Sequence, residues 1–330
     1  MENFEKDKIN KAFQILSQEA KDLYLSEEVA TINAEHIAIN PLKFYRDYVS
    51  RNVPVLVKNG VSKWPAINKW NANYFRKLLS DKLVTVAVTP NGYADAVLSD
   101  NNKKYFMLPE EREMKMSLFL DNLDNPIDDE IFYIQQQNSN FESYFYELWH
   151  DIDNLVWAND VFGKSPDAIN FWMGDKRAVT SMHKDPYENI YCVVNGEKNF
   201  ILHPPTDLPW IPYDKYPSAI YKKQSNNKWD IIVNEKINLS TCLDNIDNEN
   251  LIPWISIDPL NPNYEKYPEY KNATTIKVKV EAGDLLYLPS LWFHHVQQSH
   301  ECIAVNFWYD MEYDIKYAYF KSIEFLCQQQ

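Results

Sequence analysis

The sequence predicts a mainly β protein with helices at both ends of the chain. Three observations support this fold class. From Val53 onward, short alternating or β-branched runs recur at short intervals, which is typical of an antiparallel barrel or sandwich. Residues 3–30 and 41–50 carry apolar positions at helical spacing among many glutamates and lysines. The tail DMEYDIKYAYFKSIEFL has the same spacing and predicts a closing helix or a partner helix.

The N-terminal part contains two local signals. Asn40 followed by Pro41 predicts the start of a helix, with an N-cap side chain and a proline at the first helical position. After the strand-like run VPVLVKNG, the dipeptide Asn91-Gly92 stands between two alternating segments and predicts a β-hairpin.

Residues 130–137 (EIFYIQQQ) predict a further strand. Side chains alternate along a strand, so Phe132 and Ile134 are expected on one face and Tyr133 on the other. The segment 141–162 is expected to be helical or irregular.

The C-terminal half contains most of the predicted strands, among them INFWMG, TIKVKVEAGDLLYLP and CIAVNFWYD. Between them lies an excursion rich in proline, asparagine and lysine, which also contains Trp210, Trp229 and Trp254. It is too aromatic for a disordered linker, so we expect an ordered insertion. The predicted organisation is an N-terminal helical segment at 1–50, a β domain at 51–310 with an insertion at about 206–274, and a C-terminal helix at 311–330.

The composition limits the class of partner. The formal net charge of −14 repels phosphate backbones, which disfavours nucleic acid and favours a basic protein or peptide. No apolar run is long enough for a membrane span, and the N-terminus lacks the apolar core of a signal peptide. We therefore expect a soluble protein of the cytoplasm, with the nucleus as a second location.

Cysteine and glycine usage excludes several kinds of site. The 6 glycines are too scattered for a dinucleotide-binding or P-loop motif. The 4 cysteines show no C-x-x-C pattern, which predicts reduced thiols and neither a zinc ribbon nor a disulfide framework: Cys192, Cys242, Cys302 and Cys327.

The stretch VTSMHKDPYENIYCVVNGEKNFILHPP (179–205) reads as a β-hairpin with an unusual polar content. Asn195-Gly196 favours a two-residue turn that would place Val193 opposite Lys198. With the period of two of a strand, most of the polar side chains then share one face: His183, Asp185, Asn189 and Lys198.

A second histidine turns part of this face into a candidate metal site. His183 and Asp185, two residues apart on one predicted strand, can offer a nitrogen and a carboxylate oxygen to the same ion, although His-x-Asp alone is weak evidence. WFHHV at 292–296 supplies the missing histidine. Two histidines and one carboxylate form the facial triad of non-haem Fe(II) oxygenases, which leaves positions open for a co-substrate and oxygen.

Several motifs together resemble one family. T-x-x-H-x-D, an asparagine nine residues before a lysine, L-P-x-x-W-F-H-H and N-F-W are similar to the Jumonji-C branch of the 2-oxoglutarate oxygenases. DAINFWMG and VPVLVKNG further resemble its small lysyl hydroxylases, and the similarity runs from about residue 40 to 320. The resemblance implies a double-stranded β-helix core, of the jelly-roll or cupin-like type.

The resemblance also implies roles for individual residues. His183, Asp185 and His294 would be the Fe(II) ligands. Lys198 would pair with the distal carboxylate of 2-oxoglutarate, because a buried lysine needs a counter-charge. The hydroxyls of Thr180 and Tyr133 would bind the same carboxylate. Thr180 lies at an odd offset from His183, so a turn or bulge must intervene between them.

Expected roles can also be given for two asparagines and for the histidines outside the triad. Asn306, within the apolar strand CIAVNFW, needs polar partners and is expected to face inward with Cys302, Ala304 and Trp308 and to meet the co-substrate. Asn189 is expected there too, with a structural amide as the alternative. We expect His295 to pack or to lie behind the metal ligands, and we expect structural or exposed roles for the rest: His36, His150, His203 and His300.

The implied reaction is the Fe(II)- and O2-dependent hydroxylation of a lysyl residue in a protein, coupled to conversion of 2-oxoglutarate to succinate and CO2. The resemblance implies a translation-associated GTPase of the developmentally regulated GTP-binding type as the substrate, and a homodimer. Acidic residues at 125–130 (PIDDE) or within 207–250 are candidates for holding the lysine ammonium group.

Three alternatives remain open. Histone lysine demethylation would use the same iron chemistry, but no zinc-finger reader module is recognisable. A peptidase is a role also attributed to the family, yet neither a Ser/His/Asp motif nor H-E-x-x-H occurs. In a non-catalytic binding barrel, the triad, Lys198 and Asn306 would be buried polar groups that cost stability without serving a function.

Overall fold

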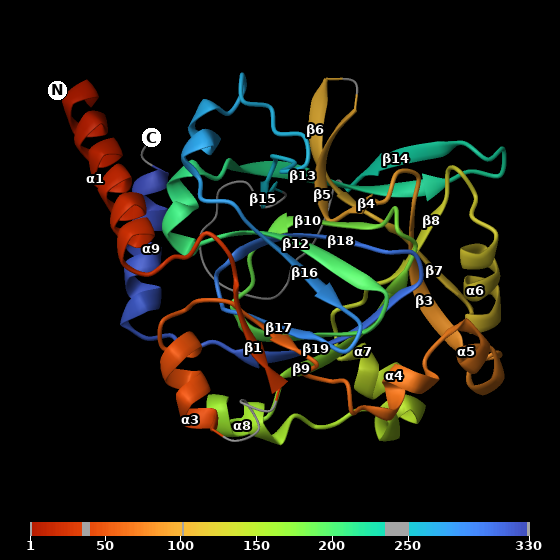
Figure 1. Cartoon of the computed structure of the whole chain (residues 1–330). Coiled ribbons are helices and arrows are strands. Elements are labelled where there is room, and N and C mark those ends of the chain that lie inside the picture. Colours follow the sequence, from red (N-terminus) through yellow and green to blue (C-terminus); the bar gives the residue numbers. More distant parts are fainter. Residues whose placement is uncertain (1, 35–39, 101, 235–250, 329–330) are drawn as a thin grey trace.

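The structure is a computed structural model that describes residues 2–34, 40–100, 102–234 and 251–328 (Figure 1). Two β-sheets lie face to face and enclose an inner core, while short helices cover the outer face of the larger sheet. This confirms the mainly β fold and the cupin-like double-stranded β-helix core.

The major sheet contains strands from every part of the chain, so it is closed by contacts between distant segments. Its spatial order is β1 (Ala30–Asn33), β2 (Val55–Lys58), β17 (Leu285–Leu288), β11 (Tyr187–Asn195), β19 (Cys302–Asp310), β9 (Ala168–Gly174), β8 (Ile131–Ile134), β3 (Leu83–Thr89) and β7 (Glu110–Lys115).

Two further sheets complete the β structure. The minor sheet faces the major one and has the order β16 (Ile276–Glu281), β12 (Glu197–His203), β18 (Phe293–Gln298), β10 (Val179–His183) and β4 (Tyr93–Ala94). The insertion sheet consists of β14 (Trp229–Val233), β13 (Tyr213–Lys223), β6 (Lys103–Leu108) and β5 (Ala96–Asp100), with β15 (Leu251–Ile255) paired to β13.

The helices form two groups. One group packs on the outer face of the major sheet: α3 (Pro41–Phe44), the π-helical turn η1 (Tyr45–Val49), α4 (Pro65–Lys69), α5 (Ala72–Leu78), α6 (Met116–Asp124), α7 (Asn140–Tyr144), η2 (Tyr146–Asp151) and α8 (Val156–Phe162). The other lies at the end of the molecule that holds both termini (Figure 1): α1 (Glu2–Leu23), η3 (Pro205–Trp210), η4 (Pro268–Asn272) and α9 (Ile315–Cys327).

Strand alternation divides the core into an inner and an outer part. On β11, Tyr191 and Val193 face the minor sheet, whereas Ile190 and Cys192 face the helices. β8 follows the same rule, because Tyr133 lies in the inner core while its neighbours Phe132 and Ile134 lie in the outer one. The period of two therefore predicts which side chains enter the space between the sheets.

The structure corrects the predicted hairpin at 179–205. β11 pairs with β17 and β19, and β12 pairs with β16 and β18, so β11 and β12 belong to different sheets. Val193 lies opposite Ala304 rather than Lys198. Gly196, at φ 75°, reverses the chain as it crosses from one sheet to the other. A positive φ at Gly196 lets the chain reverse its direction, but the strand with which each flanking strand pairs depends on the neighbouring strands in its sheet.

A second predicted hairpin is also wrong. Around Asn91-Gly92, β3 pairs with β7 and β8, whereas β4 runs parallel to β10 in the minor sheet. The helix predicted over 3–30 ends at Leu23, and Ala30–Asn33 instead forms a parallel edge strand with β2. Strand pairing at the edge of the major sheet overrides helical spacing in that short segment.

Other local predictions are confirmed. The side chain of Asn40 accepts a hydrogen bond from the backbone N–H of Lys43 at 2.8 Å and caps α3, which begins at Pro41. The tail forms α9, and 141–162 contains α7, η2 and α8 with irregular connections. The tryptophans of the insertion lie in or beside ordered elements, whereas His36 and Cys242 lie outside the described residues.

Two properties of the described residues bear on partners and redox state. Their cysteines are free thiols: Cys192 and Cys302 are buried, and Cys327 is partly exposed. Among the helices in the described ranges, none combines the length and apolarity needed to cross a bilayer.

Candidate metal centre and co-substrate pocket

Three side chains meet where the minor sheet opens toward the solvent. His183 is the last residue of β10 and lies opposite His294 of the adjacent strand β18. Asp185 follows β10 in the connection to β11, so the predicted placement of His183 and Asp185 on one strand is wrong. The carbonyl of Asp185 accepts a hydrogen bond from the backbone N–H of Leu291 at 2.9 Å, which holds this connection beside His294.

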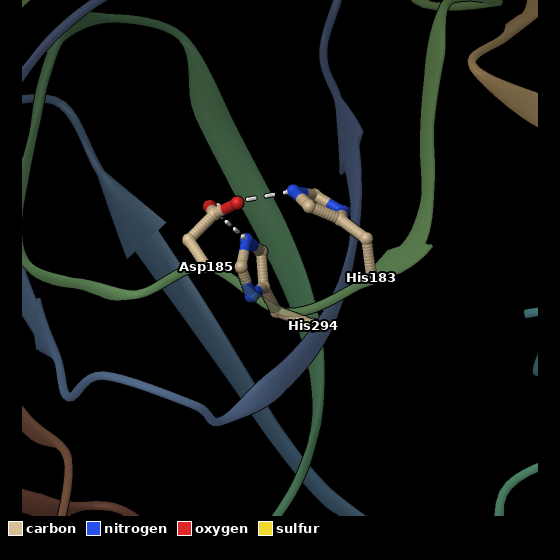
Figure 2. Close-up of side chains that lie close together, drawn as sticks. All are labelled: His183, Asp185 and His294. Carbon is tan, nitrogen blue, oxygen red and sulfur yellow. Dashed lines mark ion pairs between the residues drawn. The ribbon is translucent and has the colours of Figure 1, made fainter. Parts of the chain in front are cut away.

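The three side chains point toward a common centre (Figure 2). Asp185 Oδ2 lies 3.5 Å from Nε2 of His183 and 3.5 Å from Nε2 of His294. One potential ligand atom from each residue lies within 4.8 Å of the other two. A single ion between them could therefore contact all three groups.

Backbone carbonyls orient both imidazoles. His183 Nδ1 lies 2.8 Å from the carbonyl oxygen of Ser181, and His294 Nδ1 lies 3.0 Å from that of Trp292. A carbonyl can only accept, so each Nδ1 carries a proton, and in the neutral imidazole Nε2 then presents a lone pair. Two neutral nitrogens and one carboxylate are a donor set that suits Fe(II), so these residues fit a bound iron ion.

The three side chains of the triad shift one another's pKa values. Burial raises the pKa of Asp185, but His183 and His294 outweigh it and hold that pKa below its usual range. Burial lowers the pKa of His183, but Asp185 outweighs burial and raises it overall. For His294, burial and the neighbouring His183 lower the pKa to about 4. The carboxylate is thus ionised, and His294 is neutral, at pH 7.

A buried lysine lies deeper between the two sheets. Lys198, on β12, is 1% exposed. Its Nζ donates to Tyr133 Oη at 2.9 Å and to Gln298 Oε1 at 2.5 Å, and no carboxylate of the described residues forms an ion pair with it. Since a buried ammonium group surrounded only by neutral partners is costly, the position calls for an anionic ligand.

The remaining predicted site residues lie around the triad. Thr180, Asn189 and Asn306 line one cavity together with the triad. The register of β10 against β18 shifts between Thr180 and His183, which is the predicted bulge. Asn306 Nδ2 donates to Asn189 Oδ1 at 3.2 Å, so the two amides lie side by side.

Sequence reasoning missed several residues of this site. Gln298 orients Lys198 and is itself held by a hydrogen bond from its Nε2 to the carbonyl of Asp175 at 2.9 Å. Trp172 donates to Asn306 Oδ1 at 2.7 Å. Trp254 stacks on His183 with 6.0 Å between ring centroids and 7° between ring planes. Inward spacing could have identified Gln298 and Trp172, but nothing local indicates Trp254.

The other described histidines lie apart from this cavity. His203 accepts or donates at both ring nitrogens, to the carbonyl of Thr274 and to the hydroxyl of Tyr270, each at 2.8 Å. His300 Nε2 contacts the carbonyl of Leu123 at 3.1 Å. His150 is exposed, and His295 is buried on the opposite face of β18 from His294. These placements agree with the predicted structural or exposed roles.

Comparison with known proteins identifies the family. The cupin-like domain family matches residues 41–315. The bifunctional peptidase and (3S)-lysyl hydroxylase JMJD7 of Homo sapiens is 47% identical over 288 residues, which cover 87% of this chain and 86% of that protein.

Two further relatives cover nearly the whole chain. JmjC domain-containing protein E of Dictyostelium discoideum is 37% identical over 96% of this chain and 94% of its own length. The lysine-specific demethylase JMJ32 of Arabidopsis thaliana is 35% identical over 96% of this chain and 91% of its own length. With its His-Asp-His site between two sheets, the chain belongs to the Jumonji-C branch of the cupin-like 2-oxoglutarate oxygenases.

Proposed function

We propose that this protein is an Fe(II)- and 2-oxoglutarate-dependent oxygenase that hydroxylates a lysyl residue of a protein substrate. The observation that carries the proposal is a metal-binding triad in a cavity lined by Tyr191, together with a buried lysine without a counter-charge, Lys198, whose Nζ lies 5.8 Å from the centroid of the Tyr191 ring. The similarity to a (3S)-lysyl hydroxylase supports lysine as the target.

His183, Asp185 and His294 would hold Fe(II). When bound, the iron supplies the activation of O2 that couples oxidation of 2-oxoglutarate, to succinate and CO2, to insertion of one oxygen atom into a C–H bond of the substrate. The backbone carbonyls at Nδ1 select the tautomer in which the Nε2 lone pair of each neutral imidazole is available to the metal.

Lys198 would bind the distal carboxylate of 2-oxoglutarate, with help from the hydroxyls of Tyr133 and Thr180. The carboxylate would supply the missing counter-charge of the buried Lys198 ammonium group through a charge-assisted hydrogen bond. Asn189 and Asn306 line the same cavity and would donate from their amides to the co-substrate. The co-substrate would then span the distance between Lys198 and the triad.

The test is an anaerobic reconstitution with Fe(II) and 2-oxoglutarate, followed by O2 and a panel of lysine-containing peptides read by mass spectrometry. Gain of one oxygen atom on lysine, with stoichiometric succinate, is the expected result. His183→Ala is the negative control, and an equal yield from this variant would overturn the metal assignment.

The same assay separates the competing functions. A demethylase releases formaldehyde from a methylated lysine, and the Arabidopsis relative is named for that activity. A peptidase cleaves the peptide, an activity in the name of the human relative. A non-catalytic barrel gives none of these products. The three ligands and the residues proposed to bind 2-oxoglutarate favour the two oxygenase activities over a peptidase or a non-catalytic barrel, and the name of the human relative supports hydroxylation.

Three expectations about the biological setting belong to this proposal. We infer a translation-associated GTPase of the developmentally regulated GTP-binding type as substrate, from the family resemblance, and a location in the cytoplasm or nucleus. We also propose a homodimer, since α9 exposes apolar side chains at Ile315, Tyr319 and Phe325. Light scattering of the purified chain would test the dimer, and a monomer at micromolar concentration would contradict it.

A further inference from the structure

Asp95, which is partly buried, has fewer polar partners than the buried carboxylates of this protein. Asp151 is paired with Lys69 and also accepts from Trp70 and Tyr74, and Asp175 is paired with Arg177. The side chain of Asp95 has one hydrogen bond, from Gln135 Nε2 to Oδ2 at 3.2 Å. Within the described ranges of the chain, no lysine or arginine forms an ion pair with it.

The backbone holds Asp95 next to the metal ligands. β4 runs parallel to β10 with Ala94 beside Thr180, so Asp95 comes next to Ser181. The Ser181 hydroxyl donates to the carbonyl of Asp95 at 2.5 Å, and the Ser181 carbonyl contacts His183 Nδ1 at 2.8 Å. Asp95 itself has a φ of 51°, a left-handed conformation that aspartate tolerates better than most residues.

The carboxylate of Asp95 has no ion-pair partner among the lysines and arginines of the described residues. Burial, opposed by His183 and assisted by Glu111, raises the pKa of Asp95 to about 6. In the proposed loaded site, Asp185 and the two carboxylates of 2-oxoglutarate balance the charges of Fe(II) and Lys198. Asp95 then remains as one enclosed negative charge, which is unfavourable unless a cation joins it.

An aromatic face lies beside the same segment. Trp254 Nε1 donates to Ser181 Oγ at 3.1 Å while its ring stacks on His183. A lysine side chain combines an apolar methylene stem with a charged ammonium group. The stem can pack on an aromatic face while the ammonium group pairs with a carboxylate. The surroundings of His183 therefore offer both parts of a lysine-binding subsite.

Three of the carboxylates expected to bind lysine have partners within the protein. Asp129 pairs with Lys223 and Glu130 pairs with Arg112. Asp207 accepts from the hydroxyl of Ser17 and from the backbone of Thr274. Residues 235–250 lie outside the described part of the chain.

We propose that Asp95 receives the ammonium group of the substrate lysine and that Trp254 packs against its methylene stem. Asp95 is thus a specificity-determining residue, which sets the side chain that reaches the metal centre. This inference rests on the proposed lysyl hydroxylation.

The test measures binding separately from turnover. The probes are the lysine peptide that the wild-type protein hydroxylates best in the panel and the same peptide with norleucine in place of that lysine, each titrated anaerobically with Fe(II) and 2-oxoglutarate bound. We expect the wild type to prefer lysine by about 10- to 100-fold, the range for a hydrogen-bonded ion pair at an enclosed site. Asp95→Asn should reduce the preference to near unity, and Asp95→Glu should restore part of it.

Controls isolate the local charge from folding and from net charge. Asp95→Asn should keep the wild-type affinity for 2-oxoglutarate, which shows an intact site. Asp160→Asn removes an exposed carboxylate on α8, on the outer face of the major sheet, and should keep the full preference. Acetylation of the target lysine should weaken binding to the wild type as strongly as norleucine does, a result that requires no variant.

The failure of this inference differs from that of the proposed function. If the wild type hydroxylates lysine and Asp95→Asn retains the preference with unchanged 2-oxoglutarate affinity, Asp95 does not bind the ammonium group. If the wild type binds acetyllysine and lysine peptides equally, the inference is wrong as well. If the wild type oxidises no lysine in the panel, lysyl hydroxylation is wrong and the inference falls with it.

Discussion

The two faces of the minor sheet contain similar residue types and use them differently. On β12, Lys198 faces the inner core and His203 faces outward, and both are buried. His203 has two backbone or hydroxyl partners that complete its hydrogen bonding. Lys198 has only neutral hydrogen-bond partners, so its ammonium charge has no counter-charge nearby. On this strand, His203 is structural because the fold supplies its partners, whereas Lys198 lacks a counter-charge and fits an anionic ligand.

Two adjacent histidines on β18, His294 and His295, also differ in role. Burial lowers the pKa of both His294 and His295 to about 4. His294 shares a centre with His183 and Asp185, but His295 faces a separate cavity of about 290 Å³, where Asp258 Oδ1 lies 3.9 Å from its Nε2. Perturbed pKa values alone would not distinguish them, so the face of the strand decides which histidine can bind metal.

The strongest test of this contrast is metal affinity. His294→Ala removes a ligand and should weaken Fe(II) or Mn(II) binding by more than about 100-fold, beyond the loss typical of residues that only support a ligand. His295→Gln, one residue away on the outer face, should retain affinity within a few fold. Anaerobic calorimetric titration measures both, and equal losses would show that the two faces do not differ in this way.

Lys198→Ala should have the next largest effect. It removes the only buried cation of the proposed cradle and should lower 2-oxoglutarate affinity by about 100-fold, the scale of a broken buried ion pair, while metal affinity stays unchanged. Lys279→Ala, on the neighbouring strand β16, removes a half-exposed lysine and serves as the control. Unchanged 2-oxoglutarate affinity in Lys198→Ala would contradict the assignment.

His203 provides a pH test on the outer face. Burial lowers its pKa to about 4, below the 6.5 of an unfolded histidine, so protons bind the unfolded chain preferentially. Its contribution to stability is present above pH 6.5 and is lost as the pH falls toward 4.

Chemical denaturation measures the free energy of unfolding at pH 7 and at pH 5. Between these pH values it should fall by about 2 kcal/mol less in His203→Gln than in the wild type. Iron and 2-oxoglutarate binding at pH 7 should be unaffected by this substitution. An identical pH dependence in both proteins would mean that His203 is not held in its neutral form.

The smallest expected effect concerns a single hydroxyl. Tyr133→Phe keeps the ring and loses the contact with Lys198, so 2-oxoglutarate affinity should fall by about 5- to 10-fold, which corresponds to about 1 kcal/mol. Tyr93→Phe removes the outer-face hydroxyl that donates to Asp258 at 3.1 Å and should leave this affinity unchanged. A similar loss in both variants would indicate a general loss of rigidity.

Local patterns were enough to assign faces. Alternation separated Tyr133 from its neighbours on β8 and predicted Lys198 and Asn306 as inward-facing, and all three lie in the space between the two sheets. The odd spacing of Thr180 predicted the bulge in β10. These features depend only on backbone geometry within a few residues, which is the same in any strand.

Pairing could not be predicted in this way. Asn195-Gly196 and Asn91-Gly92 both indicated hairpins, yet each joins strands of different sheets. A turn dipeptide sets the reversal of the chain, but the partner of a strand depends on which other strands bury its two edges. The register derived for Lys198 was therefore wrong even though its face was right.

The sequence by itself determined the residue types of the metal triad, the face of each strand and the acidic charge that favours a cationic substrate. Only the tertiary structure placed Asp185 beyond the end of β10, Gln298 against Lys198, and Asp95 and Trp254 around Ser181. The physical reason is distance along the chain. Alternation and capping act between neighbours, whereas contacts between segments far apart arise only when the two sheets close around a shared core.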